Sequence, residues 1–294
     1  MYKNVQSLLD ITKQLNIPLH EVILKNEMIY NNLMEEEVYS RLAKHYDTMV
    51  ASATRAVMQP LEMTGNLIKG FSFKQGKYGS GDTLCGDYLN NIMTMAFSSC
   101  EVNASMGRIC AAPTAGSCGI LPAVLIETAR KFDLPTKDVL NALLVASGFG
   151  AIFMANATVS GAEGGCQAEC GVAAAIAGAA AVYMAGGTAK MCANAVGIAL
   201  INCMGLICDP VAGLVQLPCG FRNASQAANA VVSADMALAG QTCAIPVDEI
   251  IDAMYKVGRK LPIEFKETSL GGLAATPTAK KLEKKLHKIS IFTE

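Results

Sequence analysis

The sequence predicts an all-α protein, a globular helical bundle. Apolar residues recur at spacings of three and four through Ser7–Leu15 and Glu21–Met58, with charged residues between them, as in helices that bury one face. Runs of alternating apolar and polar residues, typical of strands, are missing, and no strand-loop-helix repeat appears. Long uncharged stretches rich in Ala and Gly fill the second half of the chain. We expect these stretches to be helices that pack on one another.

The uncharged stretches are Val139–Ala162, Cys170–Thr188 and Met191–Cys208. Their length would suit membrane spans, but they consist of Ala and Gly with scattered Asn and Ser, and not of solid Leu, Ile and Phe. Small residues allow helices to approach one another closely. We therefore interpret the stretches as buried core helices and expect no membrane association.

Five segments rich in Gly and Pro interrupt the helical pattern. The first, Gly76–Asp87, separates a charged N-terminal region, residues 1–75, from an apolar body, residues 76–294, and we expect the two to form one domain. The other four are CAAPTAGSCGILPAVL (110–125), SGAEGGCQAECG (160–171), CDPVAGLVQLPCG (208–220) and ETSLGGLAATPTA (267–279), the last before a basic helix, Lys280–Lys288. We expect these turns between helices to converge on one place.

Composition narrows the class of protein. The chain has 294 residues, of which 52% are hydrophobic and only 17% charged, a low charged fraction that favours an oligomer over a monomer. The net charge is −1 and no basic tract is present, which argues against nucleic acid as a partner. The N-terminal stretch lacks the apolar core of a signal peptide, and the eleven cysteines are typical of reduced thiols or metal ligands in the cytoplasm.

Five cysteines are candidate metal ligands. Cys166 and Cys170 lie in the third segment, Cys208 and Cys219 lie in the fourth, and Cys203 lies just before the fourth. They form no CxxC pairs, and the three histidines lie far away in sequence, so a structural zinc site is disfavoured. An iron–sulfur cluster tolerates dispersed ligands, because each iron needs only one thiolate. Core cysteines without a metal are equally compatible with this spacing.

Two of the turns offer groups that suit a small carboxylate. Thr114 and Ser117 precede an apolar helical run, where a hydroxyl can cap the helix and backbone N–H groups can bind an anion. The segment GSGDTLCGD offers similar groups, with Ser80 and Thr83 on either side of Asp82. Ordinary capped turns explain each motif as well. Neither is a phosphate loop.

Several long motifs carry a family resemblance. The segments SGDTLCGD, EVNASMGRICAAPTAGSCGILPAVL, GAEGGCQAECGVAAA, NCMGLICDPVAGLVQLPC and ETSLGGLAATPTA resemble the α chain of iron–sulfur-dependent L-serine dehydratases, over about Thr64 to Ala279. The resemblance implies a 4Fe–4S cluster held by Cys166, Cys208 and Cys219. It leaves Cys170 and Cys203 as packing residues.

The resemblance also implies the reaction, in which water is eliminated from L-serine to give pyruvate and ammonia. An iron without a protein ligand would bind the leaving hydroxyl, and a base would take the α-proton. The residues implied around the substrate are Ser80, Asp82, Thr83, Asn103, Thr114 and Ser117. The base is left open. His45 and Lys69 are candidates, although lone groups of this kind are commonly surface residues.

Single-chain members of the family have an extra N-terminal domain, so the resemblance is to the two-chain type, and we expect a separate β chain. No cysteine follows Cys243, so capping of the open iron by a tail cysteine is not expected. Three alternatives stay open: an L-cysteine desulfidase with the same cluster chemistry, a hydro-lyase acting on a hydroxy acid without an amino group, and a subunit whose cluster is not catalytic.

Overall fold

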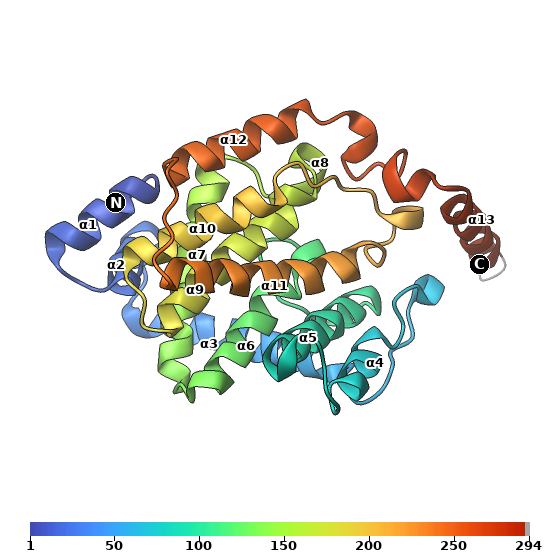
Figure 1. Ribbon diagram of the computed structural model, residues 1–294, viewed down its shortest axis with the longest axis horizontal. Helices are drawn as coiled ribbons and strands as arrows, with labels where there is room; N and C mark the ends of the chain where they lie inside the picture. Colours follow the sequence, from blue (N-terminus) through green and yellow to red (C-terminus); the bar gives the residue numbers. More distant parts are fainter. Residues whose placement is uncertain (292–294) are drawn as a thin grey trace.

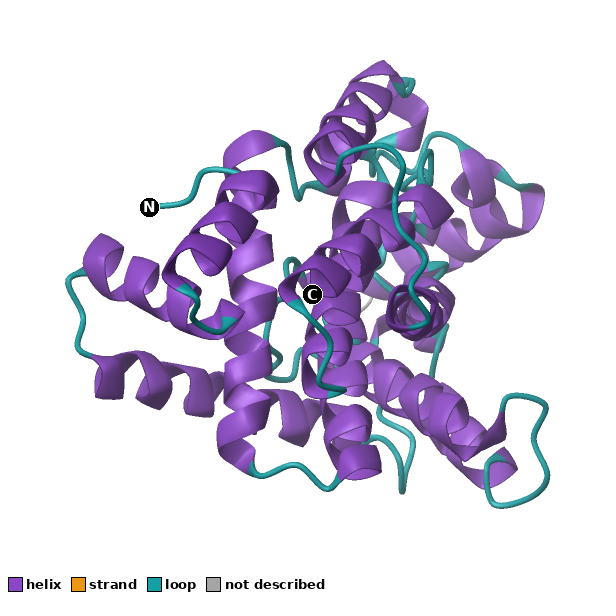
Figure 2. Cartoon of the chain, turned by 60° about the vertical axis from the view of Figure 1, so that its left-hand side comes forward, coloured by secondary structure: helices purple, strands orange, loops and turns teal. Residues whose placement is uncertain are grey.

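The computed structural model describes residues 1–291, which form helices joined by loops (Figures 1 and 2). The α-helices are α1 (Val5–Leu15), α2 (Leu19–Asn31), α3 (Glu35–Arg55), α4 (Phe71–Tyr78), α5 (Gly86–Ala104), α6 (Ile120–Phe132), α7 (Thr136–Asn156), α8 (Gly161–Gly164), α9 (Val172–Met184), α10 (Ala189–Cys203), α11 (Cys219–Leu238), α12 (Val247–Lys260) and α13 (Pro277–Ile291). Short 3-10 turns are η1 (Thr64–Asn66), η2 (Ala115–Ser117), η4 (Val211–Gly213), η5 (Ile263–Phe265) and η6 (Gly272–Ala275), and η3 (Gln167–Gly171) is a π turn. Within residues 1–291 the only strand-like pairing is one bridge between Cys208 and Lys266. The all-α class is confirmed.

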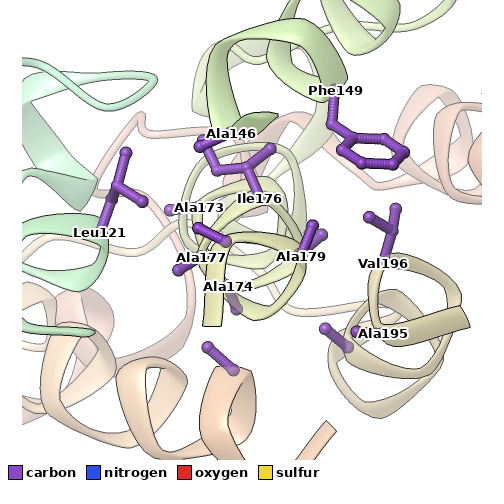
Figure 3. Close-up of a cluster of buried hydrophobic side chains, with 14 of the residues drawn as sticks. Leu121, Ala146, Phe149, Ala173, Ala174, Ile176, Ala177, Ala179, Ala195 and Val196 are labelled. Atoms are coloured by element: carbon purple, nitrogen blue, oxygen red, sulfur yellow. The ribbon is translucent and has the colours of Figure 1, made fainter. Parts of the chain in front are cut away.

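Helix α9 lies at the centre of the bundle, against α6, α7, α10 and α11 (Figures 1 and 3). All of its residues except Tyr183 are buried. Its small side chains bring neighbouring backbones close: a Cβ atom added at Gly178 would lie 3.1 Å from the carbonyl oxygen of Ala230 in α11. Figure 3 shows Ala173 and Ala177 of α9 on the side of Leu121 of α6, and Ile176 on the side of Ala146 of α7. The second uncharged stretch is therefore a core helix, as its composition predicts.

Two helical segments are long and apolar enough to cross a bilayer, Thr136–Asn156 and Gln167–Met184. Their most apolar windows are 67% and 89% buried inside the protein. Burial of that extent is what the core helices of a bundle show, so the packing explains their apolar character. The third uncharged stretch contains the shorter helix α10.

The N-terminal helices pack into the same core as the body. Val5, Leu8 and Ile23 belong to one buried cluster with Phe149 and Val172. The start of α1 is also tied to α12, because the carboxylate of Asp248 accepts hydrogen bonds from the backbone N–H groups of Val5 (2.8 Å) and Gln6 (2.9 Å). The helical stretch Glu21–Met58 is divided into α2 and α3, since the chain turns at Asn32 with a left-handed φ of 50°.

A buried carboxylate organises the segment between α3 and α5. Glu101 of α5 accepts hydrogen bonds from the backbone N–H groups of Gly70 (3.0 Å) and Ser72 (2.8 Å) at the start of α4. Such groups have no partner inside the helix, and the N-terminal end of a helix favours a negative charge. The first Gly-rich segment, Gly76–Asp87, then covers the end of α4 and the loop to α5.

Candidate active site

Hydrogen bonds join four of the five Gly- and Pro-rich segments. Thr114 Oγ1 donates to Glu169 Oε1 at 2.9 Å, which links the second segment to the third. Cys208 Sγ donates to Glu169 Oε2 at 3.6 Å, which links the third to the fourth. The backbone N–H of Leu273 donates to Asp209 Oδ2 at 2.6 Å, which links the fourth to the fifth. Among the described residues, the first segment makes no hydrogen bond to the other four.

Cys166 is buried, with 3% of its surface exposed, in the turn between α8 and the π turn η3. The turn depends on Gly165, whose φ of 75° is left-handed and whose backbone passes close to Leu206. Gln167, which directly follows Cys166, donates its backbone N–H to the Leu206 carbonyl oxygen at 3.0 Å. Cys166 is thereby held beside the segment that carries Cys208.

Cys208 is buried and lies in the extended segment after α10. Its backbone N–H donates to the carbonyl oxygen of Phe265 at 2.9 Å, and its carbonyl accepts from the N–H of Glu267 at 2.8 Å. These bonds occupy both backbone polar groups, and the side chain reaches Glu169. The C-terminal segment thus fixes the position of this thiol.

Cys219 is the first residue of α11 and is partly exposed. One turn later, Asn223 donates its side-chain N–H groups to the carbonyl oxygens of Cys219 (2.9 Å) and Gly116 (2.7 Å). Its amide oxygen accepts from the backbone N–H of Gly119 at 2.9 Å. Asn223 therefore joins the helix that begins at Cys219 to the turn that carries Thr114 and Ser117.

The three predicted ligand thiols, Cys166, Cys208 and Cys219, affect one another electrostatically. Burial, together with the charges of Cys166 and Glu169, raises the pKa of Cys219 to about 12, and the Arg222 cation opposes that effect. Burial also raises the pKa of the Cys208 thiol, as do the charges of Glu169, Cys166 and Cys219. The pKa of the Cys166 thiol is lowered, chiefly by interaction with Cys170. Burial raises this pKa, and the Arg222 cation lowers it. We call these three thiols, with Glu169 and Arg222, the cysteine centre.

Glu169 is the carboxyl group of the cysteine centre. It is 9% exposed, and burial raises its pKa above the usual range, while the hydrogen bond from Thr114 partly opposes that effect. The neighbouring position 161 must be small, because a Cβ atom at Gly161 would overlap Glu169 Oε2 and lie 3.2 Å from Cys208 Sγ. A buried carboxyl group with a raised pKa is a candidate for proton transfer.

Three of the predicted substrate residues lie in or against one turn that reaches this carboxyl group. Thr114 contacts it directly, and Ser117 Oγ lies 3.2 Å from Thr114 Oγ1. Asn103 of α5 donates a side-chain N–H to the carbonyl oxygen of Ala115, in the same turn, at 3.3 Å. The structure therefore brings Asn103, Thr114 and Ser117 together, and Thr114 joins their turn to Glu169.

The other three predicted substrate residues, Ser80, Asp82 and Thr83, lie on the loop between α4 and α5. Ser80 and Asp82 are exposed, and the Ser80 hydroxyl donates to the carbonyl oxygen of Lys77 at 2.7 Å. The Thr83 hydroxyl is buried without a hydrogen-bond partner. No hydrogen bond or ion pair between described residues joins this loop to the cysteine centre, so the assignment of these three residues stays a prediction.

The two candidate bases have other neighbours. His45 is exposed on α3, and its Nδ1 atom lies 3.6 Å from the thiol of Cys110. Lys69 pairs with the exposed carboxylate of Glu62. Neither side chain contacts Glu169 or the three predicted ligand thiols through a hydrogen bond or ion pair among the described residues.

Cys170 and Cys203, the two predicted packing cysteines, are buried next to the cysteine centre. Cys170 Sγ lies 4.0 Å from both the Gly116 carbonyl oxygen and Asn223 Nδ2. Cys203 Sγ donates to the carbonyl oxygen of Leu200 at 3.4 Å, within its own helix, and burial raises its pKa to about 12. Both fill space between helices, and Cys170 also contacts Cys166.

The sequence interpretation missed the roles of Glu169, Arg222 and Asn223. All three lie inside or directly beside the cysteine-containing third and fourth segments. A signal was present, because Glu169 and Arg222 are rare charges in apolar stretches and a buried charge needs a partner. Several partners lie far away in sequence, such as Thr114 at 55 positions from Glu169 and Gly116 at 107 positions from Asn223, and only the folded chain shows them.

The described residues also form a cavity of about 690 Å³ away from the cysteine centre. It lies between the N-terminal residues, α2 and the end of α7, and Tyr2, Asn26, Tyr30 and Met154 are among the residues that line it. None of the predicted site residues borders it.

The geometry defines a class of protein, an all-α protein whose interhelical turns gather buried thiols around a carboxyl group. Residues 14–274 match the serine dehydratase alpha chain family, and the chain belongs to that family.

Similar proteins include the L-serine dehydratase alpha chain of Peptoniphilus asaccharolyticus, 44% identical over 97% of this chain and 98% of the relative. A probable L-serine dehydratase alpha chain of Bacillus subtilis (strain 168) is 44% identical over 97% of this chain and 95% of the relative. L-serine dehydratase 1 of Escherichia coli (strain K12) is 34% identical over 93% of this chain but only 61% of the relative.

Proposed function

We propose that this chain carries the catalytic centre of an L-serine dehydratase, a lyase that converts L-serine to pyruvate and ammonia. Support comes from family membership over most of the chain and from the names of relatives that match it nearly end to end. The observation that carries the proposal is the buried carboxyl group of Glu169, to which both Thr114 and Cys208 bond, with Cys166 held beside the segment of Cys208 by the Gln167–Leu206 hydrogen bond.

The donor set fits a 4Fe–4S cluster better than a single ion. Cys166 comes from the third segment and Cys208 and Cys219 from the two ends of the fourth, and the three thiols influence one another. Yet no three His, Cys, Asp or Glu side chains among the described residues are grouped closely enough for one metal ion. A cluster is several ångströms wide and takes one thiolate per iron, so its ligands stand apart. We assign Cys166, Cys208 and Cys219 as the residues that would hold it. When bound, such a cluster supplies a Lewis-acidic iron for the serine hydroxyl.

The chain's own residues would bind the substrate and accept its α-proton. The turn that carries Thr114 and Ser117, with Asn103 of α5 bonded to it, offers polar side chains and the N–H groups at the start of α6, which suit the carboxylate of serine. Ser80, Asp82 and Thr83 remain proposed substrate residues on the strength of the family resemblance alone.

We assign Glu169 as the residue that takes the α-proton. Its carboxyl group is the buried one at the centre, and a raised pKa makes the carboxylate a stronger base for a weakly acidic proton. The Thr114 hydroxyl holds Oε1 and the Cys208 side chain lies against Oε2, so the group is fixed in orientation. His45 and Lys69 are less suited, because each is occupied elsewhere.

The partners and the location follow from the same proposal. The relatives named as alpha chains support a separate β chain, and the low charged fraction supports burial of further surface in an oligomer. L-serine is the small-molecule partner. A cytoplasmic location is in keeping with eleven free cysteines.

An L-cysteine desulfidase and a non-catalytic cluster subunit are separated from this function by one assay. Anaerobically reconstituted protein, with and without a β chain, is given L-serine, L-cysteine or glycerate at equal concentrations. We expect pyruvate and ammonia from L-serine at a rate well above any sulfide release from L-cysteine. Preference for L-cysteine would replace the proposal with the desulfidase, and turnover of glycerate with a hydro-lyase. Iron-loaded protein inactive on every substrate would favour a non-catalytic role.

The role of Glu169 has its own test. Glu169→Gln keeps the shape and a hydrogen-bond acceptor but cannot take the proton, so we expect a fall in kcat of about 10²-fold or more with cluster absorbance retained. The matched control is Glu163→Gln, an exposed carboxyl group in the same motif that accepts from Thr158. A Glu169→Gln enzyme with normal kcat would assign the base elsewhere.

A further inference from the structure

Arg222 is the positive charge of the cysteine centre, and its side chain is only 15% exposed. One nitrogen, Nη2, pairs with Asp209 Oδ1 at 2.8 Å, and the other, Nη1, donates to the carbonyl oxygen of Ile207 at 2.7 Å. The positive charge of the guanidinium also acts on the nearby Cys166 thiol, whose pKa it lowers. A planar group with several fixed donors can meet three partners at once, which an ammonium group cannot do with the same geometry.

Asp209, the partner carboxylate, is fixed from its other side. Its side chain is 2% exposed, and Oδ2 accepts the backbone N–H of Leu273 at 2.6 Å. The backbone at Gly272 approaches this carboxylate so closely, with a left-handed φ of 58°, that a Cβ atom there would overlap it. The ion pair is therefore buried and anchored at both ends.

The ion pair is linked to the surroundings of all three predicted ligands. Asp209 directly follows Cys208, and Arg222 lies in the first turn of α11, which begins at Cys219. Cys166 is reached through the Leu206–Ile207 backbone: Arg222 donates to the Ile207 carbonyl oxygen, and the Leu206 carbonyl oxygen accepts the N–H of Gln167, the residue after Cys166. We propose that the Arg222–Asp209 pair positions the three ligand cysteines for the cluster and offsets the negative charge that gathers there. This inference rests on the proposed cofactor.

The physical reason is the cost of placing like charges together in a buried site. Three thiolates can stand near one another only if their mutual repulsion and loss of water are compensated. A fixed guanidinium supplies that compensation, and Asp209 holds it in place. Arg222 and Asp209 are thus positioning residues, and neither is assigned a contact with substrate.

The test compares four variants for cluster binding and for reduction potential. Arg222→Met removes the charge, Arg222→Lys keeps the charge without the planar geometry, and Asp209→Asn removes the anchor. Arg259→Met is the matched control, because it removes an exposed arginine from the end of α12. Iron and sulfide per chain are counted after anaerobic reconstitution, and the cluster's midpoint potential is measured by dye-mediated titration.

We expect Arg222→Met to retain iron about tenfold more weakly than the wild type, with Arg222→Lys and Asp209→Asn intermediate and Arg259→Met unchanged. The potential of the remaining cluster should become more negative in Arg222→Met, since a lost cation disfavours an added electron. It should move less in Arg222→Lys. Circular dichroism shows whether each variant folds. If Arg222→Met does not fold, Arg222→Lys and Asp209→Asn test the inference in its place.

Normal iron content and an unchanged potential in both Arg222 variants would overturn the inference while leaving the proposed function intact. Lower iron content with an unchanged potential of the remaining cluster in Arg222→Met would reduce the pair to a packing role and would overturn the charge-compensating part. Wild-type protein that binds no cluster would overturn the cofactor assignment, and this inference with it.

Discussion

At the scale of single residues, five buried or partly buried cysteines lie in one region, and their surroundings separate them. Cys208 is fixed by backbone hydrogen bonds from the C-terminal segment, Cys219 begins α11, and Cys166 directly follows the left-handed Gly165. Cys203, by contrast, bonds to the carbonyl oxygen one turn earlier in its own helix, as an ordinary core cysteine does. The three proposed ligands thus lie at breaks between helices and Cys203 does not, whereas Cys170 lies inside the π turn η3 and only the family resemblance separates it from them.

Serine substitutions test the assignment of ligands. We expect Cys166→Ser, Cys208→Ser and Cys219→Ser each to abolish cluster absorbance after anaerobic reconstitution, because a serine hydroxyl is a poor replacement for a soft thiolate. Cys203→Ser and Cys170→Ser should keep it. The measurement is visible absorbance with iron and sulfide counts. A Cys203→Ser protein without a cluster would contradict the assignment.

The residue types of the centre could be predicted from the sequence only in part. The cysteines, Thr114 and Ser117 stood out because they sit at breaks in a helical pattern. Glu169 and Arg222 did not, because their roles depend on contacts with Cys208 and Asp209 that periodicity does not reveal. The segment that contains Ser80, Asp82 and Thr83 resembles the Thr114 turn in sequence, yet it forms a separate loop between α4 and α5.

At the scale of elements, helix contacts through small residues place the turn that carries Thr114. Gly119 precedes α6, and a Cβ atom there would lie 2.5 Å from the backbone carbonyl oxygen of Ala96 in α5. A backbone atom cannot rotate away as a side chain can. The spacing between α5 and α6 is therefore set by this glycine.

Gly119→Ala should destabilise the protein by about 1–3 kcal/mol through this overlap. Gly150→Ala is the control, because a Cβ atom there meets nothing within 4 Å and alanine is favoured over glycine inside a helix by about 0.5–1 kcal/mol. The free energy of unfolding, measured with denaturant, should therefore fall in Gly119→Ala and rise in Gly150→Ala. Equal stability of Gly119→Ala and the wild type would show that α5 and α6 shift freely.

A histidine between α2 and α9 should make stability depend on pH. His20 Nδ1 lies 2.7 Å from the Tyr183 hydroxyl, and burial lowers the His20 pKa below 6.5, with Glu21 opposing and Lys137 reinforcing the shift. Between the lowered pKa and 6.5 the unfolded chain binds more protons than the folded one, so stability falls as the pH drops through that window.

His20→Gln keeps a polar partner for Tyr183 but does not titrate. We expect the wild type to lose stability relative to this variant when the pH falls from 7 to 5, measured by chemical denaturation at each pH. A stability difference that stays constant across this range would show that His20 titrates alike in the folded and unfolded chains.

The elements themselves were largely predictable. The uncharged stretches contain α7, α9 and α10, because apolar composition and helical length were both visible in the sequence. The break between α2 and α3 was not, since it depends on one left-handed asparagine in a pattern that otherwise continues. The π turn after Cys166 also lacked a signal, as its geometry follows from packing against α12 and the Leu206 segment.

At the scale of the whole molecule, one core supports one centre. Helices from both ends of the chain share one buried core with α9, and the C-terminal segment returns to hold Cys208 and Asp209 (Figure 1). The centre and the residues bonded to it come from positions 103 to 273, which lie within the residues 14–274 that match the family. The fold class follows from local periodicity, whereas the centre depends on this long-range return of the chain.

The central claim is that serine dehydration depends on a cluster held by this chain. The most direct measurement prepares one batch of protein at several cluster occupancies, from iron-free to fully reconstituted, and records L-serine-dependent pyruvate formation against iron and sulfide per chain. We predict activity that rises in proportion to cluster content and vanishes in the iron-free sample. Iron-free protein that dehydrates L-serine as fast as the loaded protein would contradict the account.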